Sequence, residues 1–174
     1  VALAATVVLP WALGGGASDF SLASGMGSGD ADTFNAGIAI DQSFGDAYVA
    51  GAFGYGFHDV STSRTVPGDT LSASFDAHSF SGRGELGYRL AMGGSTVAPY
   101  AAFQAINYRL PGYAETATGP GTFALSYASS STTATRGELG IRLEHLMALG
   151  DAGTVLKLTG RAAWAINGNT GRRV

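Results

Sequence analysis

The octapeptide "RGELGYRL" at residues 83–90 returns almost unchanged as "RGELGIRL" at residues 136–143. Successive side chains of an extended strand point to opposite faces, so Arg83, Glu85 and Arg89 would share one face. Leu86 and Leu90 would then lie on the other face. Because the second copy has the same alternation, the repeat predicts two β-strands, each with one charged and one apolar face.

Composition separates this chain from ordinary soluble domains. It has 174 residues, 45% of them apolar, with 27 Gly, no Cys and only 13% charged residues, whereas soluble domains carry about 25% charged residues. No apolar run approaches the roughly 18 residues that a membrane-spanning helix needs. Net charge is −3 and the basic residues are scattered, so we expect no nucleic-acid partner.

Alternation with period two extends along almost the whole chain and predicts an all-β fold. The expected strands cover residues 3–22, 31–43, 47–61, 71–90, 97–109, 123–146 and 154–167. Three glycines, Gly14 to Gly16, mark a place where the first of these strands bends or divides. We expect a single domain over residues 1–174, truncated at both ends.

The predicted connections alternate between short and long. Residues 43–47, 91–96 and 147–153 form short turns, whereas residues 23–32, 61–70 and 110–122 form longer, polar, Gly- and Pro-rich loops. Transmembrane β-barrels have this asymmetry, with tight turns on the periplasmic side and long loops outside. The fold class is therefore an antiparallel up-and-down meander of about seven strands, part of or a reduced version of a transmembrane β-barrel.

Six of the ten cationic residues lie mid-strand on one face, interleaved with carboxylates. In a membrane barrel such a face lines the water-filled lumen. The predicted lumen-facing charged belt consists of Arg83, Glu85, Arg89, Arg136, Glu138, Arg142, Glu144, Lys157 and Arg161. We expect its members to pair with one another and hold the wall together, rather than to bind a charged substrate.

The opposite face of the same strands is apolar and would meet lipid on the convex side. Its predicted members are Leu86, Tyr88, Leu139, Ile141, Leu156, Leu158 and Trp164. The strand at 47–61 differs, because its lumen side carries only small residues. This predicted small wall consists of Ala50, Ala52, Gly54 and Gly56, and it leaves space for a threaded segment.

The turn sequences also predict register. A hairpin over residues 91–96 places Leu90 opposite Val97, which brings Gly87 opposite Tyr100, Glu85 opposite Ala102 and Arg83 opposite Gln104. Tyr100 would then cover the bare backbone of Gly87. In the last hairpin, Glu144 would lie opposite Lys157 and Arg161 opposite Gly140.

This register predicts a belt that spans three strands. Arg83 and Glu85 would reach Arg136 and Glu138 across roughly 10 Å, which is two strand spacings. The intervening residue, Ala102, is small enough to permit the contact.

The segments "FSLASGMGSGDADTFNAGIAI", "AYVAGAFGYGFHDVSTSRTV", "HSFSGRGELGYRL", "VAPYAAFQAINYRLPGYAE", "TFALSY" and "LTGRAAWAIN" resemble consecutive strands of the C-terminal translocator domain of autotransporters. The resemblance spans about residues 11–167. It implies the middle segment of an outer-membrane barrel in Gram-negative bacteria, through which an N-terminal passenger is exported by type V secretion. The implied partners are outer-membrane lipid, the passenger polypeptide of the same parent protein and the outer-membrane insertion machinery.

No motif predicts enzymatic chemistry. "GRGELG" at residues 82–87 satisfies a Gly-rich nucleotide-binding pattern, but it lies within a strand rather than at a strand-to-helix turn. His58, His78 and His145 are far apart in sequence, and no G-x-S-x-G elbow occurs. We expect no catalytic, cofactor-binding or metal-binding residues.

Two alternatives remain open at this point. A small general outer-membrane porin or OmpA-like barrel would close on eight strands, with the first strand split at Gly14 to Gly16. A soluble β-barrel binding domain would bury the Leu86 face and expose the arginine face. Exposure of Leu86 distinguishes the soluble alternative from a membrane barrel.

Overall fold

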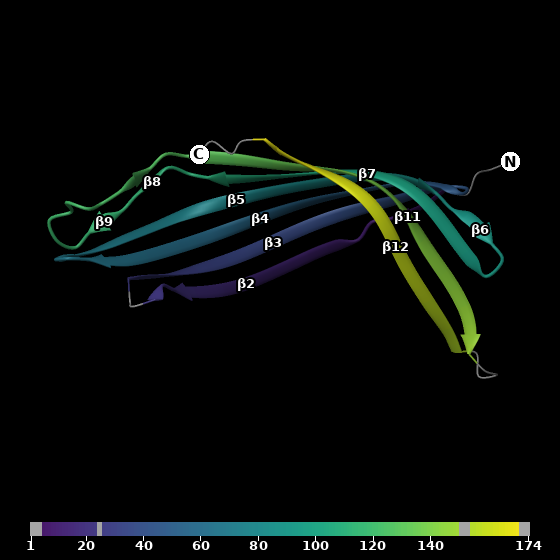
Figure 1. The fold of residues 1–174 in the computed structure, drawn as a ribbon, viewed down its shortest axis with the longest axis horizontal. Coiled ribbons are helices and arrows are strands. Elements are labelled where there is room, and N and C mark those ends of the chain that lie inside the picture. The colour runs from purple at the N-terminus through teal and green to yellow at the C-terminus, as the bar shows by residue number, and fades with distance from the viewer. Residues whose placement is uncertain (1–4, 24–25, 150–153, 171–174) are drawn as a thin grey trace.

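The computed structural model describes residues 5–23, 26–149 and 154–170. It is a single curved β-sheet with one small additional hairpin (Figure 1). None of the described residues belongs to a helix with the length and apolar character required to span a bilayer. The regular elements of the described residues are all strands, so the all-β prediction is confirmed.

The long strands contain between 11 and 20 residues. The strands are β1 (Ala5–Val8), β2 (Trp11–Ser21), β3 (Gly27–Phe44), β4 (Ala47–Val66), β5 (Asp69–Tyr88), β6 (Leu90–Met92), β7 (Ser95–Leu110), β8 (Tyr113–Ala114), β9 (Thr116–Ala117), β10 (Ser126–Tyr127), β11 (Ser130–Leu149) and β12 (Thr154–Thr170).

Each long strand pairs antiparallel with its neighbour in the chain. The order is β3–β4–β5–β7–β11–β12, with β1 and β2 both pairing with β3, while β6 pairs with β7 beyond the end of β5. These pairings confirm the meander of about seven strands. Within the described residues β12 pairs only with β11 and the sheet does not close, so it lacks the eight-stranded closure of an OmpA-like barrel.

The first predicted strand divides at a different place from the three glycines. Its two parts, β1 and β2, are separated by Leu9 and Pro10, whereas Gly14 to Gly16 lie inside β2. Proline has no backbone N–H and cannot donate to the ladder. The carbonyl of Pro10 nevertheless accepts a hydrogen bond of 2.9 Å from the N–H of Ala39.

Three predicted boundaries are wrong at the loop end. Residues 27–32 belong to β3 and not to a long loop. Residues 61–70 are not a long loop, because β4 and β5 continue until Pro67 and Gly68 form a tight turn. Gly68 has a φ of 83°, a left-handed conformation that glycine adopts without strain. Residues 123–129 are not part of the long strand, since β11 begins at Ser130 and the loop that precedes it contains β10.

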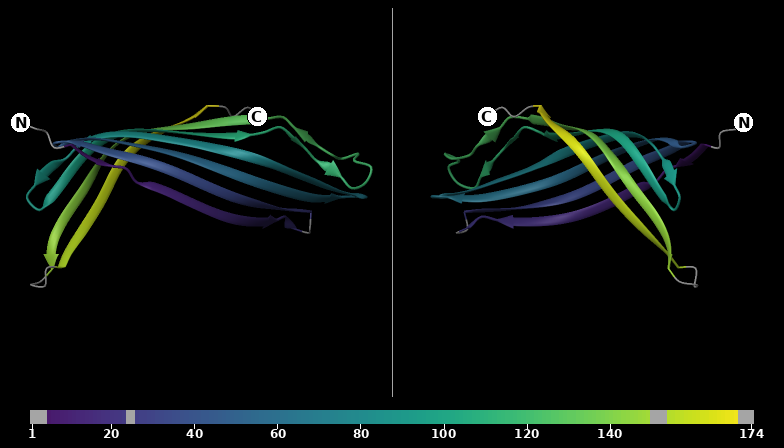
Figure 2. Two further views of the ribbon diagram at one scale, coloured as in Figure 1. Left: turned by 180° about the vertical axis from the view of Figure 1, so that it is seen from behind. Right: turned by 45° about the vertical axis from the view of Figure 1, so that its right-hand side comes forward.

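The sheet is strongly curved. β11 and β12 bend away from the direction of β3 to β5 in both views of Figure 2. The β6–β7 hairpin and the segment with β8 and β9 lie at opposite ends of the sheet (Figure 1). One end therefore has tight turns, and the other has the long connection between β7 and β11.

Candidate functional site: the charged concave face

Burial identifies the concave face of the single-layer sheet. The buried aromatic and charged side chains of its central part, Tyr48, Glu85, Tyr100 and Glu138, all belong to one face in the observed register. Leu86 on the opposite face is 62% exposed. Side chains converge only on the inside of a curved layer, so the charged face is concave and the leucine face is convex.

Glu85 is the centre of the first charge cluster. It is only 6% exposed, and its carboxylate accepts hydrogen bonds from Arg83 at 2.8 Å and from the Tyr48 hydroxyl at 2.9 Å. Arg142, two strands away, donates to both carboxylate oxygens, with a distance of 2.8 Å from Nη2 to Oε2. The charge of Glu85 is therefore fully neutralised although no second sheet covers it.

Glu138 is the centre of the second cluster and is 4% exposed. The Tyr100 hydroxyl donates to it at 2.5 Å, Arg136 donates at 3.3 Å, and Arg161 is hydrogen bonded to the same carboxylate. Arg83 reaches Glu138 across β7 at 3.5 Å. The structure thus brings the two copies of the repeat into contact, and Arg83 contacts both glutamates.

Each cluster also contains a tyrosine that lies over a glycine of the neighbouring strand. A Cβ atom added to Gly87 would lie 2.4 Å from the Tyr48 ring, and one added to Gly140 would lie 2.7 Å from the Tyr100 ring. The predicted cover of Gly87 by Tyr100 is therefore wrong. Tyr100 is opposite both Gly87 and Gly140, but its ring lies over Gly140, and Tyr48 covers Gly87.

The model of the autotransporter beta-domain family matches residues 1–174. This chain belongs to the autotransporter beta-domain family. No curated protein sequence matches it significantly.

Two solved autotransporter barrels are similar to this beta-domain chain. One is the translocator domain of autotransporter NalP from Neisseria meningitidis, with 18% identity, a TM-score of 0.67 and coverage of 96% of this chain. The other is the beta domain of the Bordetella autotransporter BrkA, with 18% identity, a TM-score of 0.58, and coverage of 98% of this chain and 76% of that one. The present chain spans 56% of the NalP chain.

The remaining members of the predicted belt lie nearer the turn end of the beta-domain sheet. Arg89 donates to Ser43 at 2.8 Å, lies 3.7 Å from Asp41 and is stacked 4.4 Å from the centroid of the Tyr48 ring. Lys157 and Glu144 form an ion pair of 2.7 Å in which both side chains are exposed.

The predicted register of the last hairpin is wrong by two residues. Glu144 lies opposite Thr159 and Arg161 lies opposite Arg142, while Lys157 lies opposite Leu146. A shift of two residues keeps every side chain on its predicted face. Lys157 therefore still reaches Glu144 diagonally. The register of the hairpin at 91–96, by contrast, is confirmed at Leu90, Gly87, Glu85 and Arg83.

The predicted small wall lies beside this network. Ala50 packs against the Tyr48 and Tyr100 cluster, and Ala52 is exposed on the concave side. Gly54 and Gly56 have less free space, because an added Cβ would lie 2.6 Å from the Ser81 hydroxyl or 2.4 Å from the Ser79 hydroxyl.

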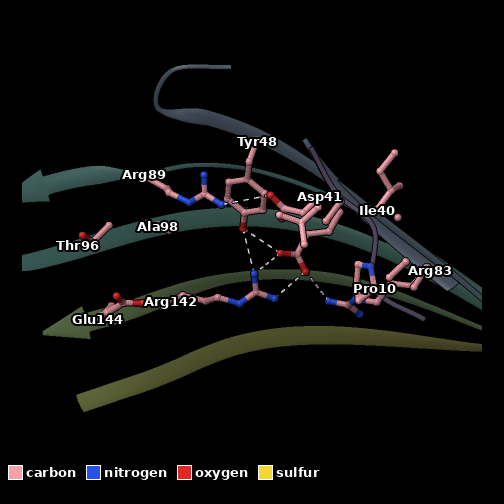
Figure 3. A pocket seen from close by; sticks show the side chains of 16 residues that line it. Pro10, Ile40, Asp41, Tyr48, Arg83, Arg89, Thr96, Ala98, Arg142 and Glu144 are labelled. Carbon is pink, nitrogen blue, oxygen red and sulfur yellow. Dashed lines mark hydrogen bonds and ion pairs between the residues drawn. The ribbon is translucent and has the colours of Figure 1, made fainter. Parts of the chain in front are cut away.

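A pocket of about 590 Å³ extends along Ala50 and Ala52. Figure 3 shows Tyr48 and Arg142 reaching into the same region from β4 and β11, with Arg89 beside the Tyr48 ring. The wall next to the charged network thus contains open space.

Sequence reasoning missed Tyr48 as a member of the site. The predicted small wall begins at Ala50, although Tyr48 is two residues earlier and shares its face. Period-two parity alone was a sufficient signal for this placement. Asp41 and Ser43 on β3 were missed for a different reason, because their role depends on the partner Arg89.

We expect Gly140→Ala to destabilise the sheet by about 1–3 kcal/mol, since the added methyl group would overlap the Tyr100 ring. Gly137→Ala, three residues earlier on β11, is the matched control because no atom lies within 4 Å of its added Cβ. Urea unfolding in lipid vesicles measures both. Equal stability of the two variants would show that the ring does not require a bare backbone beneath it.

Proposed function

We propose that this chain is an outer-membrane translocator segment of an autotransporter, with its convex face against lipid and its concave face lining the channel for an exported N-terminal passenger. The observation that carries the proposal is the combination of an exposed apolar convex face, with Leu86 at 62% exposure, and a concave face whose buried glutamates are ion-paired with arginines. A soluble domain requires the reverse arrangement, in which Leu86 is buried.

The convex face has the dimensions of a membrane-spanning band. Asp32, Asp59 and Asp76 lie opposite one another on adjacent strands, are exposed, and mark its loop-side limit. Three adjacent carboxylates are strongly disfavoured inside hydrocarbon.

Tyr88 marks the other limit of the band. Between these limits, the described convex positions of β3, β4 and β5 carry no Asp, Glu, Lys or Arg. The steps from Asp76 to Tyr88, at roughly 3.4 Å each and a tilt of about 45°, span about 29 Å. This length is close to the apolar band of outer-membrane barrels, about 25 Å tall.

The proposal includes partners and location. The outer membrane of a Gram-negative cell would supply the lipid, the insertion machinery of that membrane would assemble the barrel, and the passenger would be part of the same parent protein. The family of the chain and its similarity to the two autotransporter barrels support these assignments. We further propose that the chain has no enzymatic activity and binds no cofactor.

The exposed Ala52 provides the test of the channel. In the parent protein, we expect Ala52→Trp to slow passenger export while leaving barrel assembly largely intact, because the indole would occupy open space on the concave side. Protease accessibility of the passenger on intact cells measures export, and heat-modifiable electrophoretic mobility measures assembly. Gly54→Trp should act in the same way, but it also displaces Ser81.

Phe53→Trp is the matched control for this experiment. It adds an indole to the adjacent convex position, which is already an exposed aromatic residue. Export should proceed at the normal rate in this variant. Normal export by Ala52→Trp as well would overturn the assignment of the concave face as the export path.

A further inference from the structure

The connection between β7 and β11 is a folded segment. It runs from Pro111 to Ser129, whereas β3 and β4, and likewise β4 and β5, are joined by two residues each. Within it, β8 pairs with β10, and β9 pairs with the start of β5 through Leu71–Ala117 and Ser72–Thr116. We call residues 111–129 the β7–β11 segment.

This segment packs on the concave side of the start of β5. Leu71 and Ala73 share the face of Glu85 and are buried, Leu71 to 1% exposure, although they lie near the end of a single-layer sheet. Ser72 and Ser74 on the convex face remain exposed. The ring of Phe75, also on the concave side, stacks at 4.2 Å on Tyr113 of the segment. Tyr113 in turn stacks at 4.7 Å on Tyr127.

The first anchor of the segment is an ion pair with β4. The Arg64 guanidinium donates to both carboxylate oxygens of Glu115 at 2.6 Å and to the carbonyl of Phe123 at 2.8 Å. Glu115 also accepts the backbone N–H of Leu125 at 2.8 Å. The Arg64 hydrogen bonds hold the pKa of Glu115 below its usual range. Glu115 is therefore charged at neutral pH, and Arg64 can hold it as a bidentate partner.

The second anchor is the carboxylate of Asp69 at the start of β5. It accepts backbone N–H groups from Gly119 at 2.8 Å, Gly121 at 2.9 Å and Thr70 at 2.8 Å. These bonds, the one from Gly121 first, lower the pKa of Asp69. Gly121 has a φ of 72°, so a side chain there would strain the turn that presents its N–H.

Both anchors lie beyond the convex aspartate row, outside the membrane-spanning band. The side chains of Phe123 and Leu125 remain exposed. The segment thus projects from β4 and β5 across the concave side, at the end where a passenger would leave.

We propose that the β7–β11 segment is a latch over the loop-side mouth of the channel, closed by Arg64–Glu115 and Asp69, and that it must move off β5 for a passenger to pass. This inference rests on the proposed function.

A disulfide between Ser72→Cys and Thr116→Cys tests the latch in the parent protein. These residues are directly opposed in an antiparallel pair, a geometry that disulfides bridge, and this chain has no Cys of its own. We expect export to be lost under oxidising conditions and recovered on reduction. The matched control is Ser61→Cys with Ser74→Cys, an opposed pair within the β4–β5 hairpin, which should export normally in both conditions.

Channel conductance of the purified parent protein in planar bilayers provides the second readout. Glu115→Gln, which releases the Arg64 anchor, should raise conductance, whereas Asp76→Asn on the convex face should not. Quantitative Ser72→Cys/Thr116→Cys crosslinking with normal export, or unchanged conductance of Glu115→Gln in an inserted protein, would overturn the latch alone. Failure of the unmodified protein to insert into the bilayer would overturn the proposed function, and the latch with it.

Discussion

Replacing Glu85 and Glu138 together by alanine should lower the free energy of unfolding by at least about 3 kcal/mol, the cost of breaking a buried ion pair. The two carboxylates form ion pairs with Arg83, Arg136, Arg142 and Arg161. Their loss leaves these cations facing one another on one wall. The tyrosine hydroxyls over Gly87 and Gly140 would also lose their acceptors.

Glu144→Ala is the matched control for this prediction. It removes a glutamate from the same face of β11, but that glutamate pairs with an exposed Lys157. Exposed pairs contribute about 0.2–1 kcal/mol, so the loss should be small. Urea unfolding in vesicles compares the variants. Similar losses for Glu144→Ala and the double variant would contradict a structural role for the buried clusters.

The two single variants should not be additive. Arg83 contacts both Glu85 and Glu138, so removing either carboxylate changes the environment of the other. Residues that share a partner commonly show interaction free energies of about 0.5–3 kcal/mol. A double-mutant cycle measures this coupling directly.

Leu139→Arg should impair membrane assembly far more than Arg136→Leu. Leu139 lies on the convex face, is 59% exposed and is opposite Trp164 of β12. An arginine at the midplane of the lipid face costs about 2–4 kcal/mol. Arg136 lies on the concave face with a partly exposed side chain, so its replacement removes one weak contact to Glu138.

Heat-modifiable mobility of the parent protein in outer-membrane fractions measures this difference. Leu139→Ala controls for the loss of the leucine and should assemble nearly as well as the unmodified protein. Equal impairment by Leu139→Arg and Arg136→Leu would argue for a fold that is not embedded in lipid.

Local alternation predicted the faces of this chain well. Residues 83–90 and 136–143 carry their charge at every second position, and a two-residue period fixes the face whatever the register. The short turn at 91–96 also fixed the register of Glu85 and Ala102. The predicted turn at residues 147–153 is longer, and a slip of two residues keeps every side chain on its face. The sequence therefore did not specify that Arg161 lies opposite Arg142.

The loop end was predicted less well. Residues 61–70 are polar on both faces, which is typical of a loop in a membrane protein. Strands that extend beyond the lipid band can also be polar on both faces, because neither face contacts hydrocarbon. Pro67 and Gly68 were the better signal for the turn. The inward fold of residues 111–129 depends on contacts between distant residues, such as Arg64 and Glu115, that no local pattern reveals.

The sequence predicted which residues belong to the charged site, but it did not predict which of them contact one another. Parity placed Arg142 and Glu85 on one face, but their contact across two strands depends on curvature, which brings the tips of concave side chains together. The same curvature allows Tyr48 to join Glu85 and Arg142 in one cluster.

The most direct test of the account is a nitroxide scan along β4 from Val49 to Phe53, with the label attached to single cysteines in the parent protein inserted in vesicles. Frequent collisions of the label with oxygen indicate that it faces lipid, and frequent collisions with a water-soluble nickel complex indicate that it faces the aqueous lumen. We predict high oxygen accessibility at Val49, Gly51 and Phe53 and high nickel accessibility at Ala50 and Ala52, alternating residue by residue. Uniform accessibility to nickel, or alternation of the opposite sense, would contradict a convex lipid face and a concave aqueous one.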